Sequence, residues 1–224
     1  MQRGVFGINA IGFKYKNGVI AAVDTGASYG MKVVYGMQSV FKATDNCIIV
    51  FSGLLSDVQF LRKFIKQEIE SDVGRKLDPQ GIHKMIQRIL YQKRSEAAPM
   101  NVSAIVCGIN QKKNEIFEST DNKGRMLGVV NSKGNFWFED SAAVSFSSNF
   151  VLPILRERDL DNLEKEDAIK LMEECFRILC YKDCRSTNNI QIGIVEEGNM
   201  EILQSYNIST NWMIGKQEEE ILIE

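Results

Sequence analysis

Several features that define other protein classes are missing from this sequence. No apolar run approaches the roughly 18 residues of a membrane-spanning helix, and the N-terminus lacks the apolar core of a signal peptide. The formal net charge is -2, so no basic excess is present to neutralise phosphates. These absences argue against a membrane protein and a nucleic-acid binder. They lead us to expect a protein of the cytoplasm and nucleus.

Metal-binding patterns are also missing. His83 is the only histidine, and Cys180 and Cys184 are too far apart in sequence for a CxxC pair. The five cysteines are odd in number and lie mostly in apolar segments, which favours reduced thiols packed in the core. We therefore expect no zinc site and no cofactor. His83 falls in a helical pattern, where we predict a solvated or helix-packing role.

No linker rich in proline, glycine or serine divides the chain. With 44% apolar residues it has ample material for one core. We therefore treat residues 1–224 as a single domain.

The first element that the sequence predicts is a β-hairpin. Asn17-Gly18 lies between two apolar-rich runs, where both residues suit a type I′ turn. The alternation in Phe13–Lys16 predicts a half-buried strand, and the continuous apolar run Val19–Val23 predicts a strand covered on both faces. Asp24 ends this second strand, and from the residues alone we interpret it as a loop-capping carboxylate. We predict a flexible loop after it.

The remaining periodicities place strands and helices in alternating blocks. Ser52-Gly53 is expected to end the early sheet, and Asp78-Pro79 reads as the cap and first residue of a helix. The order is strands, two helices, strands, two helices, strands, which indicates a layered α+β domain with helix pairs outside antiparallel sheets. Strands are expected at 39–43, 47–51, 102–109, 115–119, 125–130, 136–138, 190–194 and 200–203, and helices at 54–69, 78–90, 151–158 and 163–181.

Four segments together carry a family resemblance: the opening hairpin, SGLLSD at 52–57, YKDCRS at 181–186 and NIQIGIVEEG at 189–198. The sequence resembles beta-type subunits of the 20S proteasome over 6–212. It is most similar to the non-catalytic members at the seventh beta position. The resemblance implies the N-terminal nucleophile hydrolase fold, a four-layer αββα sandwich of two antiparallel sheets.

Active members of this family use an N-terminal Thr, whose pKa is lowered by a Lys that an Asp holds in place. By this resemblance the Thr position falls on Ile8, and Asp24 matches the Asp. The Lys position falls on Ser39, or on Val40 if the loop is aligned without a gap. Residues 1–24 contain no Ser, Thr or Cys. The resemblance therefore implies a site that lacks its nucleophile and its cation.

The supporting parts of that site are matched more closely. Gly53 corresponds to the glycine whose amide helps to form the oxyanion hole, and Asp183 and Ser186 correspond to the pair that supports the Thr. The small polar run beside the nucleophile reads Ser145–Ser148 and places the ring of Phe146 among the serines. For Asp183 and Ser186 we expect a hydrogen-bonding role at a helix end, without catalytic duty.

These matches lead us to expect an inactive structural subunit. It would complete the beta ring of the core particle in ATP- and ubiquitin-dependent degradation, with other alpha and beta subunits in stacked seven-membered rings as partners. A short leader, residues 1–7, is expected either to persist or to be trimmed by a neighbouring active subunit, because no Thr is present for autolysis.

The C-terminal tail, residues 207–224, contains apolar groups that a monomer would leave in water. In the family the corresponding tail reaches the opposite beta ring, and we expect the same contact here. The tail residues expected to bind a partner are Trp212, Met213, Ile214, Ile221, Leu222 and Ile223.

Two alternatives remain open from the sequence. One is an active hydrolase of the same fold that uses an unusual nucleophile such as Thr25 after an internal cut, which would remove the first hairpin and Asp24. The other is a free-standing α+β interaction domain.

Overall fold

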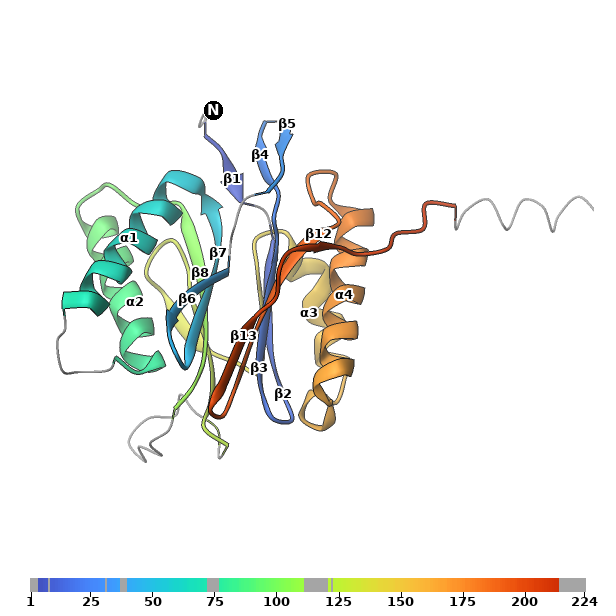
Figure 1. The fold of residues 1–224 in the computed structure, drawn as a ribbon. Coiled ribbons are helices and arrows are strands. Elements are labelled where there is room, and N and C mark those ends of the chain that lie inside the picture. The colour runs from blue at the N-terminus through green and yellow to red at the C-terminus, as the bar shows by residue number, and fades with distance from the viewer. Residues whose placement is uncertain are drawn as a thin grey trace, which may run out of the picture.

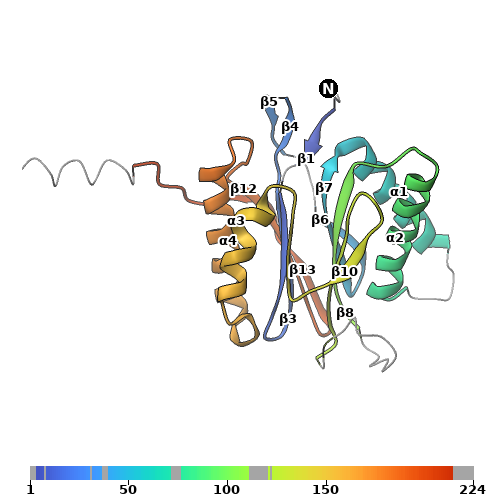
Figure 2. The same cartoon turned by 180° about the vertical axis from the view of Figure 1, so that it is seen from behind.

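The structure, a computed structural model, describes residues 4–7, 9–30, 32–36, 40–71, 77–110, 121 and 123–213. Its elements form four layers: a helix pair, two facing antiparallel sheets, and a second helix group (Figures 1 and 2). The layered αββα prediction is therefore confirmed.

The larger sheet has the strand order β10-β9-β8-β7-β1-β4-β5, with β6 added alongside β7. Every pairing in it is antiparallel. Its strands are β1 (Phe6–Gly7), β4 (Ala27–Tyr29), β5 (Lys32–Val34), β6 (Val40–Thr44), β7 (Cys47–Leu54), β8 (Val102–Ile109), β9 (Arg125–Val130) and β10 (Phe136–Phe138). From β8 to β10 each strand pairs with the next one along the chain.

The smaller sheet has the order β11-β2-β3-β12-β13, with β14 paired to β12. The predicted hairpin is its β2–β3 pair, in which Tyr15 lies opposite Gly18 across the Asn17-Gly18 turn. Its strands are β2 (Ala10–Tyr15), β3 (Gly18–Asp24), β11 (Ser141–Val144), β12 (Asn189–Glu196), β13 (Asn199–Ile202) and β14 (Tyr206–Asn207).

Two helices cover the outer face of each sheet (Figure 1). On the larger sheet these are α1 (Leu55–Ser71) and α2 (Pro79–Ser95), and on the smaller sheet α3 (Ser147–Glu157) and α4 (Lys165–Lys182), joined by a 3₁₀ turn, η1 (Leu160–Asn162). The predicted start of α2 is confirmed, because the Asp78 carboxylate accepts the Gly81 N–H at 2.7 Å and Pro79 needs no donor partner there. No described helix has the length and apolarity to cross a membrane.

Three apolar clusters fill the spaces between the four layers. One lies between the sheets and includes Val23, Val50 and Leu127. A second joins the smaller sheet to α3 and α4, and a third joins the larger sheet to α1 and α2. Because both sheets are covered on both faces, β2, β3 and β9 are buried at every residue.

The structure corrects the strand assignments around the hairpin. β2 is not half-buried: Lys14 is 7% exposed, and its ammonium reaches the water-facing Asp140 carboxylate at 2.9 Å. Ser52-Gly53 does not end the sheet, because β7 continues to Leu54 by pairing with β8 and β1. The predicted flexible loop after Asp24 is instead the β4–β5 hairpin.

Other corrections concern short elements. α3 begins at Ser147 rather than at residue 151, and β1, β11 and β14 were not predicted. The strand predicted at 115–119 lies outside the described residues. His83 is fully buried in a helix-packing role, with its Nε2 3.2 Å from the Val129 carbonyl and its ring against Phe138. All five cysteines are free, and only Cys184 is exposed.

Candidate functional site

Asp24 ends β3 and is the deepest acid of the predicted site. It lies opposite Ile190 of β12 and is 2% exposed. Its Oδ1 accepts the backbone N–H of Asn9 at 3.3 Å, and its Oδ2 accepts the hydroxyl of Ser186 at 3.3 Å. The carboxylate thus joins the start of β2 to the turn that follows α4.

Burial dominates the electrostatics of this acid. Removal from water raises the pKa of Asp24 to about 7. Hydrogen bonds from the backbone N–H groups of Asn9 and Thr187 and from the Ser186 hydroxyl lower the pKa, but by less. These contacts are all uncharged. Near neutral pH the carboxyl group is therefore partly protonated.

The turn after α4 brings Asp183 and Ser186 together through the backbone. The Ser186 N–H donates to the Asp183 carbonyl at 3.0 Å. The Asp183 side chain instead accepts from Arg185, at 3.1 Å from its backbone N–H and 3.3 Å from its Nε. Asp183 therefore orders the turn, and Ser186 is the member of the pair that reaches Asp24.

The structure describes only some of the other predicted site residues. Ile8 and Ser39 lie outside the described residues. Val40, the other candidate for the Lys position, is 6% exposed in the cluster between the sheets, and its N–H donates to Gln191 Oε1 at 3.3 Å. Gly53 lies opposite Gly7 in the β7–β1 pair. It has φ +134°, and a Cβ there would stand 2.2 Å from the Asn101 carbonyl oxygen, so no other residue fits.

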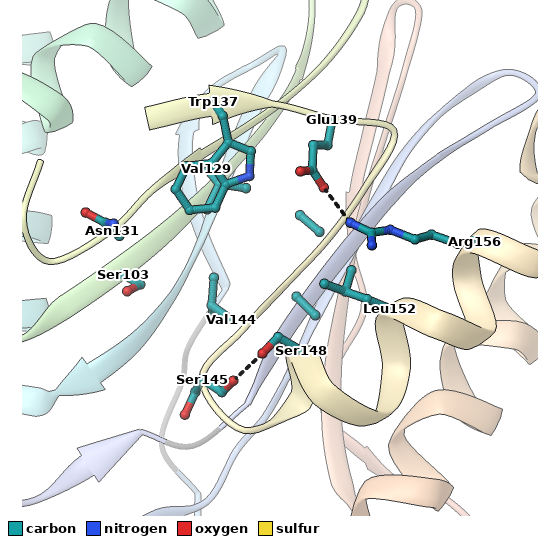
Figure 3. Close-up of a pocket in the computed structure, with 12 residues that line it drawn as sticks. Ser103, Val129, Asn131, Trp137, Glu139, Val144, Ser145, Ser148, Leu152 and Arg156 are labelled. Carbon is teal, nitrogen blue, oxygen red and sulfur yellow. Dashed lines mark hydrogen bonds and ion pairs between the residues drawn. The ribbon is translucent and has the colours of Figure 1, made fainter. Parts of the chain in front are cut away.

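The run Ser145–Ser148 turns the chain from β11 into α3. Ser147 is buried, and its hydroxyl donates to the Val144 carbonyl at 2.6 Å. Phe146 is instead 38% exposed, and its ring packs against that of Phe150. The same turn borders a cavity of about 340 Å³. Figure 3 shows Trp137 on the opposite side and the Glu139–Arg156 ion pair, at 3.8 Å, near its upper edge.

Three neighbours of Asp24 were missed by the sequence reasoning. Asn9 and Thr187 supply backbone N–H groups, for which the sequence carries no signal. Cys180 lies on the last turn of α4 and donates its thiol to the Thr187 carbonyl at 3.2 Å. Burial raises the pKa of this thiol, which favours its neutral form.

Thr25, the alternative nucleophile, follows Asp24 directly. It is 2% exposed, and its hydroxyl donates to Asn189 Oδ1 at 2.7 Å. Its backbone N–H donates to the Asn189 carbonyl at 2.9 Å. The hydroxyl and the backbone N–H of Thr25 are therefore both hydrogen-bonded to the first residue of β12.

Among the described residues of this site there is a buried acid, a glycine of positive φ and a set of hydrogen-bonded turns, with no nucleophile placed against a base. No group of three or more potential metal ligands occurs among them either. The four layers and the acid at the end of β3 define the class: the fold is that of the N-terminal nucleophile hydrolases.

The family follows from comparison with known proteins. Residues 6–195 match the family model described as "Proteasome subunit". The chain is 41% identical over 228 residues to a probable proteasome subunit beta type-7 of Encephalitozoon cuniculi, covering 100% of both chains. It is 29% identical to proteasome subunit beta type-4 of Arabidopsis thaliana (93% of this chain, 82% of the relative) and 30% identical to that of Xenopus laevis (94% and 85%).

The chain therefore belongs to the proteasome subunit family, in its beta-type branch. Relatives named beta type-7 and beta type-4 both occur among these similar proteins, which agrees with the resemblance to the seventh beta position.

The described part of the tail runs along the C-terminal end of α4. The Arg177 Nε donates to the Ser209 carbonyl at 2.9 Å, and the Tyr181 hydroxyl accepts the Asn211 N–H at 2.7 Å. Trp212 packs edge-on against Tyr181 with ring centroids 5.0 Å apart, yet remains 68% exposed; Met213 is 58% exposed. The tail residues Ile214, Ile221, Leu222 and Ile223 lie outside the described residues.

Proposed function

We propose that this chain is a non-catalytic structural subunit of the 20S proteasome core. In this role it completes a seven-membered beta ring and shapes the clefts of active neighbours, in ATP- and ubiquitin-dependent protein degradation in the cytoplasm and nucleus. Two observations carry the proposal: the sequence places Ile8 at the nucleophile position, and the donors to Asp24 among the described residues are all uncharged. An aliphatic side chain cannot attack a carbonyl, and loss of a nucleophile removes most of the rate of such a site.

The alternative nucleophile receives no support from its surroundings. A cut before Thr25 would separate β2 and β3 together from the rest of the chain, although β3 pairs with β12 from Gly18 to Asp24 and β2 pairs with β11. It would also remove Asp24, and the Thr25 hydroxyl would have to leave its hydrogen bond to Asn189 before it could attack a carbonyl. Without β2 and β3 the smaller sheet would lose two of its central strands, so the site would lose its support.

An electrophilic probe that acylates N-terminal threonine tests inactivity directly. The probe is added to the assembly purified through a tagged copy of this chain, and labelled peptides are mapped by mass spectrometry. We expect label on neighbouring subunits and none on this chain, with a heat-denatured assembly as the control. A labelled Thr25 would contradict the proposal.

The tail forms the second part of the proposed role, because Trp212 and Met213 present apolar surface to solvent next to α4. We propose that this surface contacts the opposite beta ring. Truncation after Tyr206 should slow the joining of half-particles, measured by native gel electrophoresis during reassembly. The control is Phe60→Ala, which removes a half-exposed ring from α1, away from the tail. Joining at the wild-type rate after truncation would count against the contact.

A further inference from the structure

One face of α4 carries three polar side chains that contact the chain after β13. Glu173, Arg177 and Tyr181 recur every four residues along this helix, so neighbouring members lie on the same face. We call these three residues the α4 stripe. Figures 1 and 2 show the described part of the tail leaving the domain past this helix. The contacts with the α4 stripe therefore decide how the tail leaves the domain.

Each member of the α4 stripe bonds to a different residue of this segment. The three hydrogen bonds run from the Tyr206 hydroxyl to Glu173 Oε1 at 2.8 Å, from Arg177 Nε to the Ser209 carbonyl at 2.9 Å, and from the Asn211 N–H to the Tyr181 hydroxyl at 2.7 Å. The order along the segment is the order along the helix. The segment therefore follows α4 in parallel over about 12 Å of its axis.

The tail starts from a fixed point. Ile208 is 3% exposed, packs in the cluster that contains α4, and donates its N–H to the Asn188 carbonyl at 2.8 Å. Trp212 follows four residues later. A flexible segment of four residues has an end-to-end distance of roughly 11 Å, so an unattached indole would move over a region of that size.

Tyr181 removes this freedom through two contacts. Its hydroxyl accepts the Asn211 N–H, and its ring packs edge-on against Trp212, with the ring centroids 5.0 Å apart and the planes at 89°. Asn211 Oδ1 in turn accepts the Met213 N–H at 2.9 Å. Trp212 nevertheless remains 68% exposed. The indole is thus fixed in position while most of its surface stays available for contact with another protein.

We infer that Tyr181 is a positioning residue that fixes Trp212 for its partner before the partner binds. The inference rests on the proposed contact of the tail and adds how this chain prepares for it. A side chain that is already ordered loses less conformational entropy on binding than one on a free tail. Tryptophan is also among the residues that most often dominate binding energy. The partner surface that fits is an apolar pocket wide enough for an indole ring.

The position of Trp212 can be measured on the isolated full-length chain. The chain has two tryptophans, so Trp137→Phe leaves Trp212 as the only one. In that background Tyr181→Ala should lower the fluorescence anisotropy of Trp212, because the indole loses its contact. The matched control is Tyr91→Ala, which removes a half-exposed tyrosine from α2 and should leave the anisotropy unchanged.

A second variant keeps the test decisive if Tyr181→Ala folds poorly. Tyr181→Phe keeps the ring but not the acceptor of the Asn211 N–H, so exchange of this amide, followed by NMR, should become at least about 10-fold faster. Protection of the β2–β3 amides confirms that each variant is folded. Unchanged anisotropy in folded Tyr181→Ala, or unchanged Asn211 exchange in Tyr181→Phe, would overturn the inference.

Reassembly of half-particles separates this inference from the proposed contact itself. Tyr181→Ala should slow joining by about 10-fold, less than truncation after Tyr206, because the tail is present but not positioned. Slow joining after truncation together with a normal rate for Tyr181→Ala would overturn the positioning role and leave the contact standing. A normal rate after truncation would contradict the contact, and with it the use of Trp212 that the inference assigns.

Discussion

Two buried charges lie at opposite ends of the β2–β3 hairpin and are treated differently. Arg125, 5% exposed, reaches Asp121 and Asp161 at 2.6 Å each and also donates to the Tyr15 carbonyl beside the hairpin turn. Asp24, at the other end, is 2% exposed, and its hydrogen-bond donors within the described part of the chain are all uncharged. At the first end, Arg125 of β9 is ion-paired with two acids and hydrogen-bonded to β2 of the smaller sheet. The second is an acidic site at which no described cationic side chain forms an ion pair with the carboxylate.

The pKa shifts express this difference. Hydrogen bonds to its two acids raise the pKa of Arg125 despite a burial that lowers it. For Asp24 burial wins and raises the pKa to about 7. A buried charge with paired partners stays ionised, whereas a buried charge held only by neutral donors is driven toward its neutral form. The Arg125 end therefore stabilises the fold, and the Asp24 end costs stability when it ionises.

The largest effect is expected at the Arg125 end. Arg125→Leu leaves Asp121, Asp161 and the Tyr15 carbonyl without their donor, and should lower the free energy of unfolding by about 3 kcal/mol in urea titrations. Arg125→Lys keeps the charge but not the fork of donors, so it should lose less. A loss within about 0.5 kcal/mol of zero for the leucine variant, typical of a surface change, would show that this link is not structural.

The next effect depends on pH at the Asp24 end. The folded-state pKa of Asp24, about 7, is above its ordinary value of 3.8. Its contribution to stability is therefore fully present below pH 3.8 and is lost as pH rises toward 7. The side chain of Asp24→Asn cannot ionise. The urea midpoint of this variant, measured relative to that of the wild type, should therefore rise between pH 4 and pH 8. Parallel midpoint curves for the two proteins would contradict the assignment, and Glu197→Gln, at an exposed carboxylate in the turn between β12 and β13, is the control.

The smallest effect is expected at Ser186. Its hydroxyl donates to Asp24 Oδ2 and favours the ionised carboxylate. Ser186→Ala should therefore cost about 1 kcal/mol at pH 8 and less at pH 4. In an Asp24→Asn background the pH dependence of that cost should vanish, which a double-mutant cycle measures. A cost that is equal at both pH values would mean that the serine acts through the turn alone.

The sequence predicted the long elements well, because each has a local apolar pattern. The β2–β3 hairpin, β8, α2 and α4 follow from turn residues and periodicity. Strands such as β4, β5 and β11 have no such pattern. They exist because longer neighbouring strands supply their hydrogen-bond partners, which no local window of sequence contains.

The same distinction applies to the site. Asp24 was found because it ends a legible strand and matches a family position, but its surroundings depend on contacts distant in sequence. Ser186 lies 162 residues away from it. The burial of Lys14 likewise depends on Asp140, 126 residues away. Backbone donors such as the Asn9 N–H are present whatever the side chain is, so the residue type does not reveal them.

Native mass spectrometry of the assembly recovered with a tagged copy of this chain tests the central claim most directly, because the mass of the chain itself is read in the same run. We predict a large multi-subunit particle that contains this chain uncut between Asp24 and Thr25. A monomer, or a chain that begins at Thr25 and has its own peptidase activity, would contradict the account.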